Sequence, residues 1–430
     1  MKKNLITLSI LSVMGTASTL AVAATNVELY GTVNVAFEKR GDSKITLKPQ
    51  DYQYASKFGI KGREDLGNGY AAIFRLEAQI NPDVGSGTYG STGTEFGFNR
   101  ESWVGLITPV GAVRIGRSTT PFVNMWIGGG FGAGRGIGEF TAGLVGAGLR
   151  TTKPEVAPRW SNALFYDVKK GGFAAGAAVT TKGSQSLVPQ EPGLSSVNNE
   201  GTPNTKHAYG AYARYEGDIN EKSSFKIGAA YQVDNGGSFS GFPAVYPAVT
   251  NDKNAPAEAK KAWAVAAGYK YGAISLSAGY AKADIDNTSL AIVNPPAPGY
   301  PAYGHLRSAT SKTLFASIKG QLTAKDAVYF SYGNYKRENK LALNPAAFVN
   351  GVGNLEGTQY SIGYEHALSK RTVVYLNARK VKVNENSCTP AAGPGLASGT
   401  ALCAGSVATV NNLLATEKDY SYDIGLSHSF

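Results

Sequence analysis

The last nine residues of the chain read YDIGLSHSF, from Tyr422 to Phe430. Large and mostly apolar side chains take the even positions, and small or polar side chains take the odd ones. Successive side chains of a β-strand point to opposite faces, so the pattern predicts a strand whose apolar face is made of Tyr422, Ile424, Leu426, His428 and Phe430. An aromatic residue at the very end predicts that the chain terminus is held in an apolar environment and does not fray into water.

The same period of two runs through most of the chain. It is clear in NVELYGTVNVAF (26–37), SFKIGAAYQVD (224–234) and AISLSAGYAK (273–282). Charged residues make up only 17% of the chain, while it contains 53 glycines and 24 tyrosines. This composition favours a β-protein with many turns over a helical protein.

The connections between the alternating segments are short and long in turn. Sixteen strands are predicted between these breaks. The short connections lie at 64–69, 108–111, 169–172, 217–222, 271–272, 321–326 and 368–371, and the long ones at about 41–50, 82–96, 119–156, 182–205, 236–259, 285–308, 339–353 and 384–416. This is the pattern of an all-β, antiparallel transmembrane barrel with short periplasmic turns, long extracellular loops and a water-filled channel.

The N-terminus has the features of a secretory signal peptide. Lys2 and Lys3 precede an apolar stretch that becomes rich in small residues, and Ala21-Val22-Ala23 fits a cleavage site. We expect a signal peptide over 1–24, with cleavage near Ala23 or Ala24, and a barrel domain over 25–430. Without the two lysines, the formal charge of +11 becomes 11 − 2 = +9.

Export also bears on the rest of the chain. Past residue 24 no run of 18 apolar residues occurs, which leaves a soluble exported protein or an outer-membrane barrel.

The two cysteines, Cys388 and Cys403, lie in a segment rich in turn residues. An oxidising compartment predicts a disulfide between them that closes a loop.

Several stretches together resemble one family. They are VELYGTV (27–33), SKFGIKGREDLGNGYAAIFRLE (56–77), RESWVGL (100–106), VGAVRIGRSTTPF (110–122), RWSNALFYD (159–167) and the terminal GLSHSF. The chain is similar to the trimeric general porins of Neisseria-like and other β-proteobacterial outer membranes. The resemblance implies a homotrimer in the outer membrane, a third loop folded into the lumen, and passive diffusion of small hydrophilic solutes, often anions.

Alternation nominates the side chains that line the lumen. Phe58 and Ile60 are expected to face lipid, so Lys57 faces inward. By the same argument the lumen receives Arg75, Glu77, Arg114 and Arg159, the last on the expectation that Trp160 and Leu164 face outward. Such charges at a narrowing determine which ions pass.

The resemblance adds to this set. It places Arg117 in the barrel wall although strict alternation disagrees, and it assigns Lys57 and Arg159 to a basic cluster. It makes the stretch from 119 to 156 the inward loop, in which Arg135, Arg150 and Lys153 stand against the two acids Glu139 and Glu155. Since basic residues exceed acids here, we expect an anion preference, with Glu139 facing the basic wall. The terminal strand resembles the segment that the barrel-assembly machinery reads.

Aromatic residues near the strand ends are expected to form the two interfacial girdles of the barrel. They are Tyr30, Tyr70, Trp103, Trp263, Tyr269, Tyr280 and Tyr422. Outer-membrane lipid and lipopolysaccharide are therefore expected partners. The net positive charge attracts anionic lipids as well as anionic solutes, so it does not by itself indicate anion transport.

Catalysis is not expected. The four histidines have no metal-binding spacing, and the glycine run GGGFGAGRG (128–136) lacks the order of a phosphate-binding loop. We expect no cofactor, no metal and no nucleic-acid partner. Two alternatives stay open, namely a porin specific for one acidic metabolite and an exported β-sandwich adhesin.

Overall fold

The computed structural model describes residues 26–49, 54–86, 97–132, 156–181, 207–235, 259–286, 305–344, 347–350, 355–383 and 420–430. These ranges contain eighteen strands and one helix. In chain order the elements are β1 (Asn26–Arg40), β2 (Thr46–Pro49), β3 (Lys57–Gly67), β4 (Tyr70–Gln79), β5 (Glu101–Thr108), β6 (Gly111–Thr119), α1 (Pro121–Gly129), β7 (Arg159–Lys170), β8 (Phe173–Thr180), β9 (Tyr209–Asn220), β10 (Ser223–Asn235), β11 (Ala259–Tyr271), β12 (Ile274–Asp286), β13 (His305–Gln321), β14 (Asp326–Asn344), β15 (Ala347–Asn350), β16 (Leu355–Ala367), β17 (Thr372–Val383) and β18 (Tyr420–Ser429).

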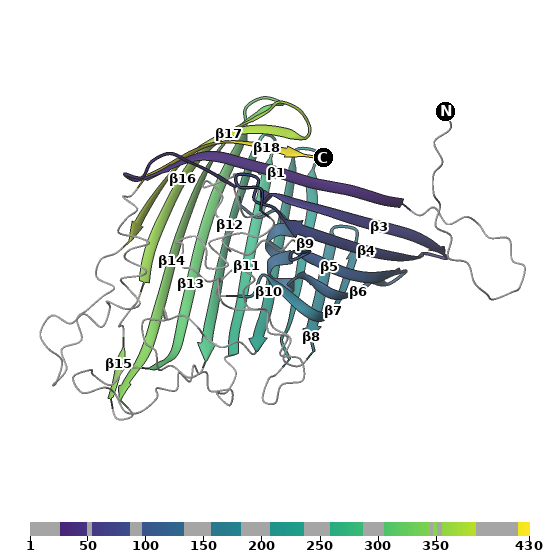
Figure 1. Ribbon diagram of the computed structural model, residues 1–430, viewed down its shortest axis with the longest axis horizontal. Coiled ribbons are helices and arrows are strands. Elements are labelled where there is room, and N and C mark those ends of the chain that lie inside the picture. The colour runs from purple at the N-terminus through teal and green to yellow at the C-terminus, as the bar shows by residue number, and fades with distance from the viewer. Residues whose placement is uncertain are drawn as a thin grey trace, which may run out of the picture.

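The strands form one antiparallel sheet that closes on itself. The first strand, β1, pairs with the last, β18, from Thr32↔Ser429 to Arg40↔Ser421, and with β3 on its other side. Figure 1 shows β1 and β18 side by side. Two strands, β2 and β15, have only four residues each and extend the pairing of β1 and β14. The other sixteen form the barrel, which confirms the predicted architecture and excludes a β-sandwich.

Connections between strands differ at the two ends of the barrel, as the sequence predicts. The turn between β3 and β4 consists of Asn68 and Gly69, both with positive φ (52° and 82°). Asn-Gly is the pair that a two-residue hairpin of this geometry favours. The other short connections are 109–110, 171–172, 221–222, 272–273, 322–325 and 368–371, and the longer ones join the strands at the opposite end.

Alternation places apolar side chains outside and small or polar ones inside. On β12 the outward Ile274 and Leu276 are 47% and 44% exposed, whereas the inward Ala281 and Ala283 are buried. In the membrane a closed sheet satisfies all backbone hydrogen bonds internally, and its outward face contacts lipid. On β18 the outward residues are Tyr422, Ile424, Leu426, His428 and Phe430, as the terminal pattern predicts.

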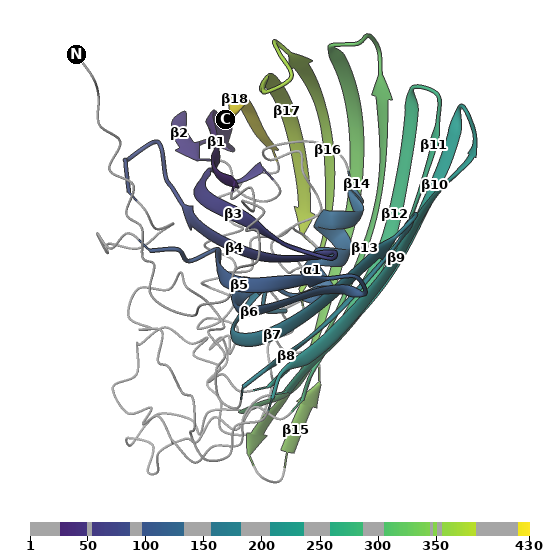
Figure 2. The same cartoon turned by 90° about the vertical axis from the view of Figure 1, so that its right-hand side faces the viewer.

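The helix α1 lies inside the barrel (Figure 2). It begins with Pro121 and ends at Gly130, which adopts a left-handed conformation (φ 58°). Its side chains Phe122, Met125 and Trp126 are buried against alanines of β10, β11 and β12 and against Phe315. Small inward residues on these strands therefore make room for a helix in the lumen.

Candidate pore constriction

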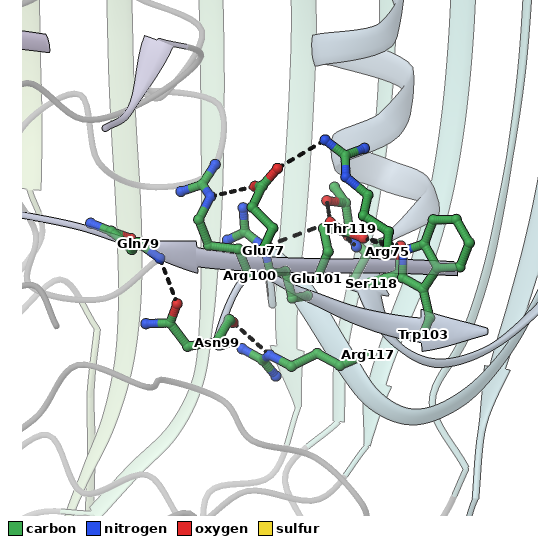
Figure 3. A network of polar contacts seen from close by, with 12 residues as sticks. Arg75, Glu77, Gln79, Asn99, Arg100, Glu101, Trp103, Arg117, Ser118 and Thr119 are labelled. Carbon is green, nitrogen blue, oxygen red and sulfur yellow. Dashed lines mark hydrogen bonds and ion pairs between the residues drawn. The ribbon is translucent and has the colours of Figure 1, made fainter. Parts of the chain in front are cut away.

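Glu77 is the centre of a charged network on the inner wall. Its Oε2 accepts hydrogen bonds from Tyr30 Oη and Arg75 Nη2, both at 2.8 Å, and its Oε1 accepts one from Arg100 Nε at 2.7 Å. Figure 3 shows Glu77 with a guanidinium group on either side. The carboxylate is only 2% exposed, so two arginines hold one buried acid in place.

Tyr30 connects this network to β1. Arg75 Nε donates to Tyr30 Oη at 2.6 Å, and the Arg75 guanidinium lies 4.9 Å from the centre of the Tyr30 ring. A Cβ atom at Gly59, on the neighbouring strand, would lie 2.5 Å from Tyr30 Oη. Glycine at position 59 therefore makes space for the tyrosine, which orients Arg75 along the wall.

Lys57 belongs to the same electrostatic group. It begins β3, where its backbone is opposite Thr32 on β1 and Gln79 on β4. The charges that act on its ammonium are those of Glu77, Arg100, Arg75 and Arg159. The predicted inward positions of Lys57, Arg75 and Glu77 therefore agree with the geometry of the wall.

A second buried acid, Glu101, lies directly opposite Glu77 on β5. It accepts hydrogen bonds from the hydroxyls of Ser118 (2.7 Å) and Thr119 (2.6 Å) and from the indole of Trp103 (2.9 Å). Arg159 Nε is 4.0 Å from Glu101 Oε1 and has no hydrogen-bond partner among the described residues. The positive charge of Arg159 is thus less fully paired than that of its neighbours.

Arg114 faces inward, as predicted, but its charge is paired. Its Nη2 donates to Asp167 at 2.5 Å and its Nη1 to Ser118 at 2.7 Å. The guanidinium lies 5.1 Å from the ring centres of both Trp103 and Phe165. This arginine joins β6 to β5 and β7 and contributes little net charge to the lumen.

The expectation that Arg117 belongs to the lumen wall is wrong. Its backbone is opposite Ser102, on the outward parity of β5 that Val104 shares at 60% exposure. Residues directly opposite in an antiparallel pair share a face. Arg117 therefore lies on the outward face, as strict alternation predicts. Arg117 donates to the Asn99 carbonyl (2.7 Å) and to Ser161 Oγ (2.8 Å), and Figure 3 shows it beside Asn99, apart from Glu77 and Glu101.

Trp160 also departs from the prediction, because it is buried and does not face lipid. Its indole donates to Asp234 Oδ1 at 2.9 Å, and the side chain packs with Phe165 and Ala163. The register between β6 and β7 shifts here, and Asn162 has φ 48°. The irregularity changes the alternation between Trp160 and Leu164, which does face outward. Arg159 nevertheless reaches Glu101.

Two of the aromatics assigned to the interfacial girdles are inside the barrel. Tyr30 contacts Arg75 and Glu77, and Trp103 contacts Glu101 and Arg114. Both lie on inward positions of their strands, so their polar atoms bind charged side chains of the lumen. Trp263, Tyr269 and Tyr422 are exposed on outward positions, as a girdle requires.

Arg100 and Glu101 are not among the residues that the sequence pattern nominates for the lumen. Arg100 precedes β5, where alternation no longer fixes the direction of a side chain, although it is part of the quoted RESWVGL motif. The helix α1 is not predicted either, although Phe122, Val123, Met125 and Trp126 have helical spacing after a proline. This helical period inside a long connection is the signal that indicates it.

Two cations of the inner wall contact the helix. Arg214 on β9 donates to the carbonyl of Asn124, near the middle of the helix, at 2.9 Å, and Lys226 on β10 donates to the carbonyl of Gly130, at its C-terminal end. The C-terminal end of a helix carries partial negative charge, so it favours a cation such as Lys226. In the closed ring, β9 to β11 lie about half a turn away from β1 and β3.

Several predicted site residues lie outside the described residues. They are the loop charges Arg135, Glu139 and Glu155, the two cysteines Cys388 and Cys403, and the whole segment 1–24. Among the described residues, no helix has the length and apolarity needed to cross a bilayer. Within those same ranges, no group of His, Cys, Asp or Glu has an arrangement suited to a metal ion.

The geometry defines a class of protein: a sixteen-stranded membrane channel whose lumen contains an inserted helix and a charged wall. The family model described as Gram-negative porin matches residues 9–386, so the chain belongs to the Gram-negative porin family. Members of this family are outer-membrane channels and not enzymes.

Relatives support this assignment. The chain is 34% identical to outer membrane porin protein 32 of Delftia acidovorans over 182 residues, which is 41% of this chain and 48% of the relative. It is 36% identical to the major outer membrane protein P.IB of Neisseria lactamica over 141 residues, or 29% of this chain and 37% of the relative. The alignments thus span about half or less of these curated relatives.

Solved structures show the same fold. An anion-selective porin from Comamonas acidovorans superposes with a TM-score of 0.59 at 21% identity, covering 94% of this chain and 100% of that one. The trimer form of OmpT from Vibrio cholerae gives a TM-score of 0.58 at 14% identity, with coverage of 95% and 100%.

Proposed function

We propose that the protein is a passive diffusion channel for small hydrophilic solutes that prefers anions. The observation that carries this proposal is the charge balance around Glu77. Four cations, Lys57, Arg75, Arg100 and Arg159, act on two buried carboxylates, Glu77 and Glu101. The wall therefore has an excess of positive charge, and α1 lies inside the same lumen.

Magnitudes support a selective effect. A pair of unit charges about 4 Å apart is worth about 4 kcal/mol at an effective dielectric of about 20, and about 1 kcal/mol in bulk water. Physiological salt screens over about 8 Å, so charges that line a constriction still act on a passing ion. Weak attraction of this size biases entry and still allows release, as conduction requires.

Reversal potentials in a salt gradient across planar bilayers test the proposal. The wild type is expected to prefer chloride over potassium, and Arg100→Gln with Arg159→Gln is expected to reduce that preference roughly twofold to fivefold. Lys222→Gln, in an exposed periplasmic turn, removes a charge away from the wall and should change nothing. A cation preference in the wild type would overturn the proposal.

The alternative of a porin specific for one acidic metabolite has a distinct signature. A specific site saturates, so one anion would block chloride current at low concentration while others of equal charge would not. A general porin shows conductance that rises with salt and no selective block. Titrating a panel of small carboxylates during single-channel recording separates these two cases.

We also propose the partners that the family resemblance implies. A homotrimer is supported by the trimeric OmpT neighbour, and it should migrate as a heat-sensitive oligomer on a gel. The outward strand from Tyr422 to Phe430 fits recognition by the barrel-assembly machinery, and the apolar outer face fits outer-membrane lipid and lipopolysaccharide. Residues 1–24 are proposed to be removed on export, and Cys388 is proposed to pair with Cys403.

A further inference from the structure

Two lysines flank one serine on the inner wall, at the periplasmic end where the short turns lie. Ser275 on β12 is directly opposite Lys270 on β11 and directly opposite Lys319 on β13. These three strands are neighbours in the sheet (Figure 1). Ser275 shares the parity of the inward Ala281 and Ala283, and directly opposite residues share a face. The serine and both lysines therefore face the lumen.

A cavity of about 420 Å³ lies between these side chains and the two short turns beside them. The residues that line it are Lys270, Gly272, Ala273, Ser275, Lys319, Gln321, Leu322, Thr323 and Ala324. All of them are described residues, and none is acidic. Pockets for small organic ligands have volumes of about 300–1,000 Å³. The cavity is thus cationic and large enough for a small organic solute.

Hydrogen bonds fix the turn that forms one side of the cavity. Gln321 Nε2 donates to the carbonyls of Thr323 and Asp326, at 2.9 and 3.1 Å. Thr323 Oγ1 donates to the Asp326 carboxylate and accepts hydrogen bonds from the backbone N–H groups of Lys325 (3.1 Å) and Asp326 (3.0 Å). A ligand that binds to groups already held in place loses less of its affinity to conformational ordering.

Acids beside the cavity balance only part of its charge. Glu365 Oε2 is 2.6 Å from Lys319 Nζ and so occupies one of the three donors of that ammonium. Asp218 is opposite Ser224, which is opposite Lys270, so the backbones of Asp218 and Lys270 are two strand spacings, or about 10 Å, apart. Lys270 has no ion-pair partner among the described residues. Two lysines and one contacting carboxylate give 2 − 1 = +1.

The other charges near the cavity are largely neighbours of opposite sign. They are Glu216 with Lys226, Glu221 with Lys222, and Lys325 with Asp326. Asp326 Oδ1 also lies 2.6 Å from Tyr364 Oη and 2.7 Å from His366 Nδ1, on the outward face. These groups therefore add little net charge to the cavity.

We propose that the cavity binds the phosphate group of a small phosphate monoester at the periplasmic mouth of the channel. Lys270, Ser275 and Lys319 supply donors from three adjacent positions, and a phosphate monoester has three terminal oxygens and a charge of about −1.5 to −2. A carboxylate has two oxygens and one charge, so it satisfies fewer of these donors. Leu322 and Ala324 contact the organic part of the solute.

This site is separate from the constriction. The cavity is formed by β11, β12, β13 and their turns, whereas Glu77 and Glu101 lie on β4 and β5. A solute bound in the side wall of the mouth leaves the constriction open, so it does not stop the chloride current. The inference rests on the proposed channel because the lumen gives the solute access to the cavity, and it does not depend on the ion preference.

The test uses the full-length porin, refolded in detergent micelles at about pH 8, where a phosphate monoester has lost its second proton. The probe is glycerol 3-phosphate, whose binding is followed by its ³¹P relaxation during titration with porin. Lys270→Gln should weaken binding roughly tenfold and Ser275→Ala roughly threefold, since a hydrogen bond to a charged donor is worth more than one to a neutral donor. The matched control Lys222→Gln removes one charge from a nearby exposed turn and should bind the probe as the wild type does.

Lys319 is tested together with its acid, because Lys319→Gln alone would remove the cation beside the Glu365 carboxylate. The double variant Lys319→Gln with Glu365→Gln removes no net charge. It should nevertheless weaken binding roughly threefold to tenfold, because the ammonium no longer donates to the phosphate. Heat-modifiable migration on a gel confirms that each variant forms the barrel. Wild-type affinity of either Lys270→Gln or the double variant would overturn the proposal.

Two competitors identify the ligand. Glycerate, which has a carboxylate in place of the phosphate, should compete roughly tenfold more weakly than glycerol 3-phosphate, and inorganic phosphate, which has no organic part, roughly threefold more weakly. Equal competition by glycerate would overturn the assignment to phosphate, and equal competition by inorganic phosphate would overturn the assignment to a monoester. A wild-type channel that prefers anions but does not bind the probe overturns this inference alone. Binding of the probe to a channel without anion preference supports it and overturns only the proposed ion preference.

Discussion

The ring of Phe430 covers Gly31. A Cβ atom at Gly31 would lie 2.3 Å from Phe430 Cζ, and the backbones of the two residues exchange hydrogen bonds of 3.1 Å in both directions. Gly31 and Phe430 therefore form the last residue pair of the seam between β1 and β18. Its side chain is 42% exposed on the outward face, where lipid surrounds it.

This pair predicts that Gly31→Val hinders closure of the barrel. The new side chain must displace the Phe430 ring, and overpacking of this kind costs about 1–3 kcal/mol. The fraction of heat-modifiable barrel on a gel and the urea midpoint should both fall. Gly320→Ala is a suitable control because its Cβ atom would meet nothing closer than 3.8 Å. Adding Phe430→Ala to Gly31→Val should restore part of the loss, and strictly additive effects would contradict the argument.

Strand alternation is the part of the structure that was predictable from sequence. It placed Lys57, Arg75 and Glu77 on the inner wall because each lies within a regular strand. It failed at Trp160 because Asn162, whose φ is positive, lies at a shift in register that alternation does not reveal. It missed Arg100 because that residue precedes β5 and reaches Glu77 from an irregular segment.

Family resemblance and periodicity disagreed at Arg117, and the geometry follows periodicity. The apolar spacing that follows Pro121 favours a helix, whereas the glycine-rich stretch around it is typical of a loop. What decides its position is tertiary: Gly228 and Gly279 leave space for Met125 and Trp126, on strands more than a hundred residues away.

Replacing the shared acid should increase the anion preference. Glu77→Gln removes the acceptor common to Tyr30, Arg75 and Arg100 and leaves the wall with one more uncompensated positive charge. The chloride-to-potassium permeability ratio is expected to rise roughly twofold to fivefold. Thermal or urea stability should drop, because removing one partner of a buried charge network is costly. The control Glu28→Gln affects a more exposed acid, whose partner is Lys61, and an equal rise there would argue against a special role of Glu77.

Loosening α1 should enlarge the channel. Trp126 is 1% exposed and contacts Phe315 at 5.5 Å between ring centres, so Trp126→Ala leaves a cavity costing about 3–5 kcal/mol. Since that cost falls on the contact between helix and wall, single-channel conductance should rise and become noisier while the barrel remains folded. Ile127→Ala changes a neighbouring residue that is 41% exposed and should leave conductance unaltered. An unchanged conductance for Trp126→Ala would show that α1 is held by Arg214 and Lys226 instead.

Replacing Arg114 and replacing Arg100 should affect the stability and the ion preference of the channel differently. Arg114 is paired with Asp167 and lies between two aromatic rings, so Arg114→Gln should lower stability by about 1–3 kcal/mol. Because Arg114→Gln alone leaves the carboxylate of Asp167 unbalanced, the variant for ion preference replaces both partners, Arg114→Gln with Asp167→Asn. This double variant removes no net charge and should change ion preference little. Arg100 shares Glu77 with Arg75, so Arg100→Gln removes charge that is only partly balanced and should reduce the anion preference at modest cost in stability. Urea unfolding of Arg114→Gln and reversal potentials of the double variant and of Arg100→Gln, measured in parallel, check this division. If the double variant shifts the reversal potential as much as Arg100→Gln does, then Arg114 and Asp167 do not act as a neutral pair.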